Sequence, residues 1–108
     1  MLDLSKIEGF EWDKGNNKKN WKKHKITNKE CEETFSSVPI YFFYDSKHSD
    51  FEPRTGMFGK TREGKLLAIV FTIRNNKIRI ITARPQSKKE KLFYIRYEEK
   101  NHKKNTEI

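Results

Sequence analysis

The chain has 108 residues, 33% of them hydrophobic and 36% charged, which allows one small domain with a modest core and excludes a second. Its 24 lysines and arginines against 15 acidic residues give a net charge of +9, which favours a polyanionic partner such as nucleic acid or an acidic protein. The sequence contains neither a membrane span of ~20 apolar residues nor the apolar segment of a signal peptide, so we expect a cytoplasmic protein.

The first half of the chain is predicted to contain strands and helices. Four elements are expected: a strand over residues 6–12, a helix over 14–24, a second helix that ends near residue 35 and a strand over 40–45. Asp13 suits the N-cap of the first helix, and Thr27 followed by Glu30 is a capping-box pattern for the second. The aromatic residues of 40–45 favour a strand, and the polar segment 46–55 is typical of a loop.

The second half is predicted to form an antiparallel meander followed by a helix. Its strands are expected over residues 57–61, 66–73 and 77–84. The second of these is almost entirely apolar and β-branched, as in a central strand, and Asn75 and Asn76 suit the tight turn after it because asparagine tolerates a positive φ. Strict alternation in the last strand predicts two faces, one with Ile78, Ile80 and Thr82 and the other with Lys77, Arg79, Ile81 and Ala83. Ser87 and Glu90 form another capping box, which starts the final helix.

These elements predict an α+β fold in which two N-terminal helices and a C-terminal helix pack on an antiparallel sheet. We assign residues 1–98 to a single domain. Residues 99–108 have no apolar pattern, so we expect a disordered basic tail there.

Residues 18–25 read KKNWKKHK and form a basic segment around one aromatic residue. Lys22 and Lys23 are candidate contacts to RNA phosphates. For Trp21 we favour a place in the core over stacking on a base. His24 lies near the predicted C-terminal end of a helix, where the dipole favours the protonated imidazole, so it is a candidate for proton transfer, with structural hydrogen bonding as the alternative.

Further basic residues fall on or beside the predicted sheet: Arg54, Lys60, Arg79 and Arg84. Cleavage of RNA by a 2′-hydroxyl builds negative charge on the phosphorus, and guanidinium groups can bind that charge bidentately. Arg79 lies between apolar neighbours, and an ion pair with Glu52 or Glu11 is the alternative to a functional role.

The sequence lacks the motifs of several other kinds of site. It has no glycine-rich phosphate loop, no calcium loop and no paired-carboxylate signature. The single cysteine, Cys31, fits a small buried side chain better than a nucleophile. The pattern therefore favours metal-independent acid–base chemistry on RNA, with no cofactor.

Several separated segments, in the right order, resemble the BrnT family of toxins. They are FEWD at 10–13, Asn20, Lys23 and His24, Gly59, Gly64, VFT at 70–72, IRIITAR at 78–84, Glu90 and Tyr94. The resemblance implies a RelE-like fold with a twisted sheet, and a ribonuclease that arrests translation as part of a type II toxin–antitoxin system. It also implies a DNA-binding, BrnA-like antitoxin that covers the toxin, in a complex that binds operator DNA and represses its own operon.

The resemblance implies catalytic roles at four matching polar positions. His24 would transfer protons, while Arg54, Arg79 and Arg84 would bind phosphate and stabilise transition-state charge; we add Lys22, Lys23 and Lys60 as RNA-binding residues.

The chain also departs from the family pattern. Asn16 stands where the family usually has a lysine, which would weaken a phosphate contact. Lys25 replaces a glycine expected as helix C-cap, and residues 41–44 are unusually aromatic. A degenerate toxin, acting as a non-catalytic nucleic-acid-binding or corepressor subunit, is therefore the alternative function.

Overall fold

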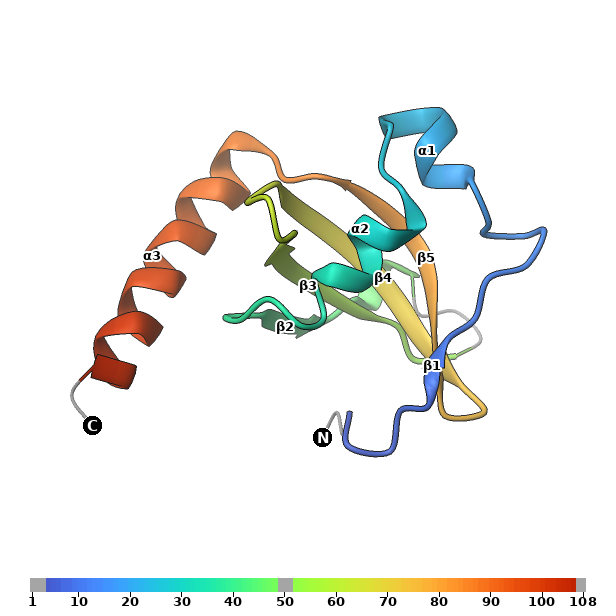
Figure 1. Ribbon diagram of the computed structural model, residues 1–108, viewed down its shortest axis with the longest axis horizontal. Coiled ribbons are helices and arrows are strands. Elements are labelled where there is room, and N and C mark those ends of the chain that lie inside the picture. The colour runs from blue at the N-terminus through green and yellow to red at the C-terminus, as the bar shows by residue number, and fades with distance from the viewer. Residues whose placement is uncertain (1–3, 49–51, 107–108) are drawn as a thin grey trace.

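A computed structural model describes residues 4–48 and 52–106, which form a five-stranded sheet with helices on both of its faces (Figure 1). The elements in chain order are β1 (Gly9–Phe10), α1 (Lys19–His24), α2 (Asn28–Glu33), β2 (Tyr41–Tyr44), a 3₁₀ helix (Ser46–His48), β3 (Thr55–Lys60), β4 (Leu66–Arg74), β5 (Lys77–Pro85) and α3 (Lys88–Thr106). The α+β class and the helix order are as predicted.

The sheet is mixed, with the strand order β1-β5-β4-β3-β2. β2 to β5 are antiparallel, as the sequence predicts. β1 differs, because it pairs in parallel with the start of β5, with Gly9 beside Lys77 and Phe10 beside Ile78. Two parallel neighbours need a long connection along the chain. Here that connection contains α1, α2 and the strands β2 to β4.

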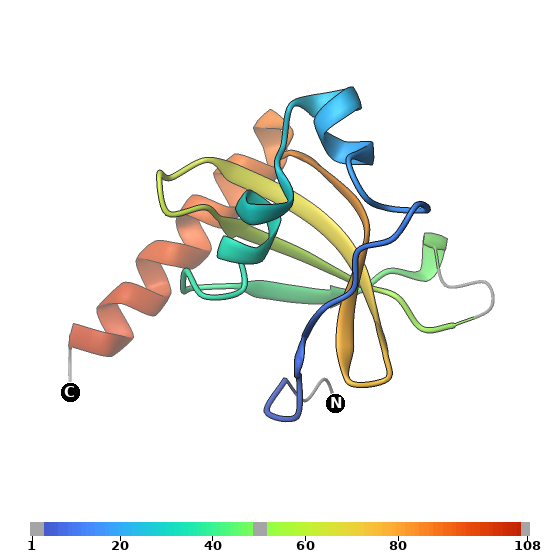
Figure 2. The ribbon, with the colours of Figure 1, turned by 45° about the vertical axis from the view of Figure 1, so that its right-hand side comes forward.

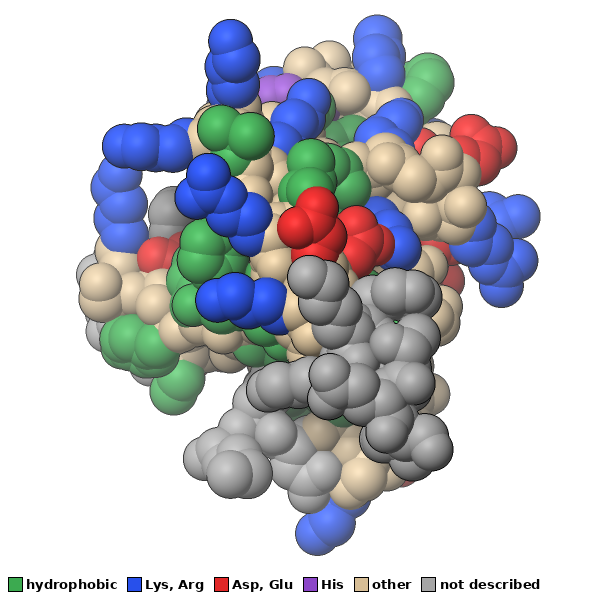
Figure 3. Space-filling model, turned by 90° about the vertical axis from the view of Figure 1, so that its left-hand side faces the viewer, with side chains coloured by type: hydrophobic (Ala, Val, Ile, Leu, Met, Phe, Trp, Pro, Cys, Tyr) green, Lys and Arg blue, Asp and Glu red, His purple; other side chains and the backbone are tan. Residues whose placement is uncertain are grey.

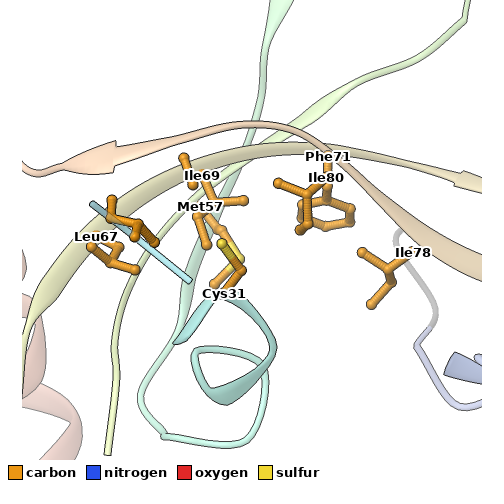
Figure 4. Packing of buried hydrophobic residues seen from close by; sticks show 9 residues of the cluster. Cys31, Met57, Leu67, Ile69, Phe71, Ile78 and Ile80 are labelled. Atoms are coloured by element: carbon orange, nitrogen blue, oxygen red, sulfur yellow. The ribbon is translucent and has the colours of Figure 1, made fainter. Parts of the chain in front are cut away.

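The core lies between one face of the sheet and α2. Figure 4 shows Cys31 pointing from α2 toward Met57 and Ile69 on the strands. Cys31 is fully buried, and this burial raises the pKa of its thiol to about 12. The prediction that Cys31 is a buried structural residue is confirmed, since such a thiol stays protonated at neutral pH.

α1 is shorter than predicted, because it begins at Lys19 and not directly after Asp13. Lys18 has a left-handed backbone with a φ of 64°, which prevents a continuous helix from residue 14. The prediction that Trp21 lies in the core is also wrong. Its neighbour Asn20 faces the sheet, so Trp21 is turned outward and 47% of its surface is exposed.

The end of α1 keeps its cap despite the missing glycine. Lys25 itself adopts the left-handed conformation, with a φ of 57°, and its N–H donates to the carbonyls of Asn20 and Trp21. The capping box of Thr27 and Glu30 then starts α2, as predicted, with both of its hydrogen bonds present. The turn between the two helices is therefore defined, at the expense of a strained lysine.

α3 packs with its first half on the sheet face opposite α2, and its second half extends away from the body (Figure 2). Tyr94 is fully buried, and its hydroxyl donates to the carbonyl of Pro39 at 2.7 Å. The helix continues to Thr106, so the backbone of residues 99–106 is helical where the sequence suggested a disordered tail; 107–108 lie outside the described residues. Lysine and glutamate are good helix formers even without an apolar pattern. Within the described residues, no helix is both long and apolar enough to cross a membrane.

Candidate active site

A β-bulge in β5 brings two arginines to the same face of the sheet. Val70 pairs with Thr82 and Phe71 with Ile80, so Ile81 is an extra residue in the ladder. Arg79 and Arg84 are five residues apart, and uninterrupted alternation would place them on opposite faces. Strict alternation, as predicted from the sequence, is therefore wrong beyond Ile80.

The bulge shifts every residue after it to the other face. Ala83 is buried with the core, whereas Thr82 and Arg84 share the opposite face with Arg79. The sheet thus presents two arginines on the side away from α2.

Three side chains from the segment around α1 bind the backbone of β5 at this bulge. The amide of Asn16 donates to the carbonyl of Ile80 at 3.0 Å, and the amine of Lys19 donates to that of Ile81 at 3.3 Å. The side-chain oxygen of Asn20 accepts from the N–H of Ala83 at 2.9 Å. These contacts cover the edge of β5 beyond its pairing with β1.

The same contacts fix the position of α1, and therefore of His24, which lies one turn after Asn20. Asn16 is 3% exposed and also bonds the carbonyl of Glu11. The side chain of Asn16 thus binds two backbone carbonyls, so a structural residue stands at the position where the sequence resemblance leads us to expect a lysine.

A pocket of about 510 Å³ lies between α1, the end of β5, and strands β2 to β4. Its basic side chains are Lys19, Lys23, His24, Lys47 and Arg84. Asp45 and Glu90 also line it, as do Phe43 and Phe58. Figure 3 shows the basic character of one face, where lysine and arginine side chains lie around a histidine in its upper part. Such a surface suits an anionic ligand.

Arg84 is held at the rim of this pocket by a bidentate ion pair with Glu90, at 2.7 and 2.9 Å. Glu90 is also the capping-box residue of α3, as predicted, accepting from the N–H of Ser87. The Arg84 guanidinium, followed by the bonds from Ser87, lowers the pKa of Glu90 to about 2. Glu90 is therefore a poor proton acceptor, and its charge orients Arg84.

Arg79 lies at the other end of the same face and has a different environment. It is 12% exposed and binds the carboxylate of Asp13 at 2.7 and 3.0 Å and that of Glu11 at 3.1 Å. The ion-pair interpretation is confirmed for Glu11, while Glu52 pairs with Arg74 instead. The pKa of Glu52 is lowered mainly by Arg74, and further by the charges of Arg54 and Arg79. Arg54 lies near Arg79, because Thr72, which is paired with Arg79, donates to the carbonyl of Pro53 at 2.9 Å.

The structure thus brings together some of the predicted site residues and separates others. His24, Lys23 and Arg84 share the pocket, while Arg54 and Arg79 do not line it and lie near Thr72, toward the other end of β5. Lys22 is exposed outside the pocket, and Lys60 pairs with Glu98 of α3.

Sequence reasoning missed Lys19, Lys47, Phe43 and Phe58 as pocket residues. The alternation of residues 41–44 was the available signal for Phe43, since it places that ring on the face opposite Phe42. Among the described side chains, no three His, Cys, Asp or Glu groups converge to hold a metal ion.

Comparison with protein-family models matches residues 12–90 to BrnT, the ribonuclease toxin of a type II toxin–antitoxin system. The match covers more than half of the chain and includes α1, the whole sheet from β2 to β5, and Glu90. A search of curated proteins finds no match. The chain therefore belongs to the BrnT family of ribonuclease toxins.

Proposed function

We propose that this chain is an endoribonuclease whose catalytic centre is the pocket that contains His24 and Arg84. The observation that carries the proposal is the meeting of these two residues, which are 60 positions apart in sequence, in one pocket with Lys19, Lys23 and Lys47. A proton donor and several phosphate-binding cations are what acid–base cleavage of RNA requires.

In the proposed reaction, the 2′-hydroxyl of the RNA gives its proton to a solvent water molecule in the open pocket and attacks the adjacent phosphorus. The bond from phosphorus to the 5′-oxygen breaks, and His24 gives its proton to that oxygen. Arg84 and the lysines bind the phosphate oxygens as negative charge builds on them. The products are a 2′,3′-cyclic phosphate and a 5′-hydroxyl, and these protein groups supply the acid and the charge without a metal ion.

Glu90 and Arg79 act through other residues in this proposal. Glu90 positions Arg84 by its bidentate pair. Arg79 binds Asp13, which begins the turn that leads to α1, so it stabilises that turn, while the contacts of Lys19 and Asn20 with β5 hold the helix that carries His24. We place Arg54 with Arg79 in this supporting group.

The RelE-like fold and the regulatory partners complete the proposal. Helices on both faces of a sheet agree with the RelE-like arrangement that the sequence resemblance implies. Membership of a type II family supports an antitoxin partner, which we expect to be BrnA-like, to bind DNA, and to repress the operon together with the toxin. The net charge of +9 suits an acidic surface on that partner.

The test is cleavage of RNA by the purified chain, freed from antitoxin, with and without EDTA. We expect cleavage in both, 2′,3′-cyclic phosphate ends, and a loss of about 10²–10⁴-fold in His24→Gln. RNA that is bound but never cut would support the corepressor alternative, and loss of cleavage in EDTA would contradict the metal-independent chemistry.

A further inference from the structure

Two aromatic rings line the pocket, which the cleavage chemistry does not require. Phe43 of β2 and Phe58 of β3 both line it, with ring centroids 5.0 Å apart and planes at 55°. Neither residue belongs to the segments that carry the family resemblance. Their place in the pocket therefore calls for a separate explanation.

Phe43 has a defined position on the sheet. It is paired across the strands with Gly56, and a Cβ added to that glycine would overlap the ring of Phe43. The ring therefore lies directly over the backbone of β3, and glycine is the residue that leaves room for it. One face of the ring is supported by the sheet.

Phe58 is held by two further aromatic rings. Its ring contacts Tyr41, with centroids 6.1 Å apart, and Phe93 of α3, also at 6.1 Å. These contacts leave Phe58 little freedom to turn, so the two rings form a rigid platform, made of Phe43 and Phe58, that needs little ordering when a ligand binds.

The platform shares the pocket with side chains whose chemistry suits phosphate. Lys47, Arg84 and Thr82 line the same pocket, whose volume of about 510 Å³ is in the range of small-ligand sites. Proteins that bind single-stranded nucleic acid combine a cationic groove with aromatic rings on which bases stack. A base in a duplex is already stacked between its neighbours and cannot lay a face on a ring.

We infer that this platform binds an unpaired nucleobase of the RNA, stacked on Phe43, next to the phosphate held by Arg84. The substrate class is therefore single-stranded RNA, with the reacting phosphate beside a base that has left its own stack. This inference rests on the proposed ribonuclease function, but it concerns binding and can be measured without cleavage.

The experiment uses a 2′-O-methyl RNA oligonucleotide that carries 2-aminopurine and cannot be cleaved through its 2′-oxygens. Stacking on Phe43 quenches the fluorescence of 2-aminopurine. We expect Phe43→Leu to weaken binding by about 5- to 100-fold and to abolish the quenching, while Phe43→Trp keeps both. Tyr44→Leu is the matched control, because it also replaces an aromatic ring by leucine, at the next residue, which is 67% exposed and outside the pocket. Thermal unfolding checks that each variant is folded.

Equal binding and quenching by wild type and folded Phe43→Leu would overturn the inference, as would equal affinity for the same oligonucleotide in a duplex. The two proposals fail separately. If wild-type protein quenches 2-aminopurine but never cuts unmodified RNA, the nuclease proposal is contradicted and the base site is supported. If wild-type protein cuts RNA, and Phe43→Leu cuts and binds it equally well, the base site is contradicted and the nuclease proposal is supported.

Discussion

Two arginines of the same strand, on the same face, have opposite environments. Arg79 is 12% exposed and bound by two carboxylates from the segment before α1. Arg84 is 47% exposed and paired with one carboxylate, at the rim of a pocket that also contains His24. Both are inside the segment that resembles the BrnT family, so sequence position does not distinguish them.

The two arginines differ in their exposure and in the number of their carboxylate partners. Two carboxylates offset the charge of Arg79, which is 12% exposed, whereas Arg84 has one carboxylate partner and is 47% exposed, so a phosphate can approach Arg84 while Glu90 holds it. We therefore assign stability to the Arg79 end of the face and chemistry to the Arg84 end. Substitutions at each end of the face test this assignment.

The largest effect is expected for Arg84→Ala. RNA cleavage should fall about 10²–10³-fold because a phosphate-binding group is lost, while the free energy of unfolding changes by less than about 1 kcal/mol because the pair is half exposed. Single-turnover cleavage and urea unfolding measure the two. Arg84→Lys keeps the charge without the bidentate geometry, so its cleavage rate should lie between those of wild type and Arg84→Ala. Full activity in Arg84→Ala would remove this residue from the site.

Asn20→Ala tests the link between α1 and the bulge. The N–H of Ala83 would lose its acceptor at a buried position, which should lower the free energy of unfolding by about 1–3 kcal/mol. Urea unfolding measures this, with exposed Asn17→Ala as control. An unchanged stability would show that the bulge does not depend on α1.

Arg79→Ala should reduce stability more than chemistry. We expect a loss of about 1–2 kcal/mol, because Asp13 and Glu11 lose a charged hydrogen-bonding partner at a partly exposed site. Cleavage per folded molecule should stay close to wild type. The result that contradicts this assignment is a normal unfolding midpoint with cleavage abolished.

Glu90→Gln tests the Arg84 end by pH. The pKa of Glu90 is depressed to about 2, so its stabilisation is fully present above its ordinary pKa near 4.5 and is lost as the pH falls toward 2. We expect the variant to be about 1 kcal/mol less stable at pH 7, a figure reduced for solvent screening, and equal to wild type near pH 2. Urea unfolding at several pH values measures this, with Glu99→Gln as the control on an exposed site of α3. A difference independent of pH would exclude the ion pair as its source.

The smallest effect is expected for Lys25→Gly, next to His24. Glycine adopts the left-handed conformation without strain, which should stabilise the protein, partly offset by loss of the lysine that lies 5.2 Å from the Trp21 ring. A net gain of about 0.5 kcal/mol in thermal or urea unfolding is the prediction. Lys29→Gly, within α2, should instead be destabilising.

Local signals predicted local structure well. The two capping boxes and the turn at Asn75 and Asn76, both with positive φ, are all present. The apolar run of residues 66–73 predicted a central strand, and β4 lies in the middle of the sheet. Each of these depends on a few neighbouring residues, which is why the sequence alone was sufficient.

The missed features depend on contacts between distant segments. The bulge at Ile81 is bound by side chains some 60 residues earlier, and no pattern within β5 indicates it. The same contacts explain why Trp21 faces outward and why His24 and Arg84 meet. For the candidate site, the residue types were predictable, but their division between the two ends of the sheet face was not.

The division of roles between Arg84 and Arg79 is tested by inducing the chain in bacteria that lack the antitoxin, and by comparing wild type with Arg84→Ala and Arg79→Ala at equal levels of folded protein. Growth arrest and fragmented RNA with wild type and Arg79→Ala, but intact RNA with Arg84→Ala, is the predicted result. Fragmented RNA with Arg84→Ala, and intact RNA with Arg79→Ala, would place the catalytic centre at the other end of the sheet and contradict the account.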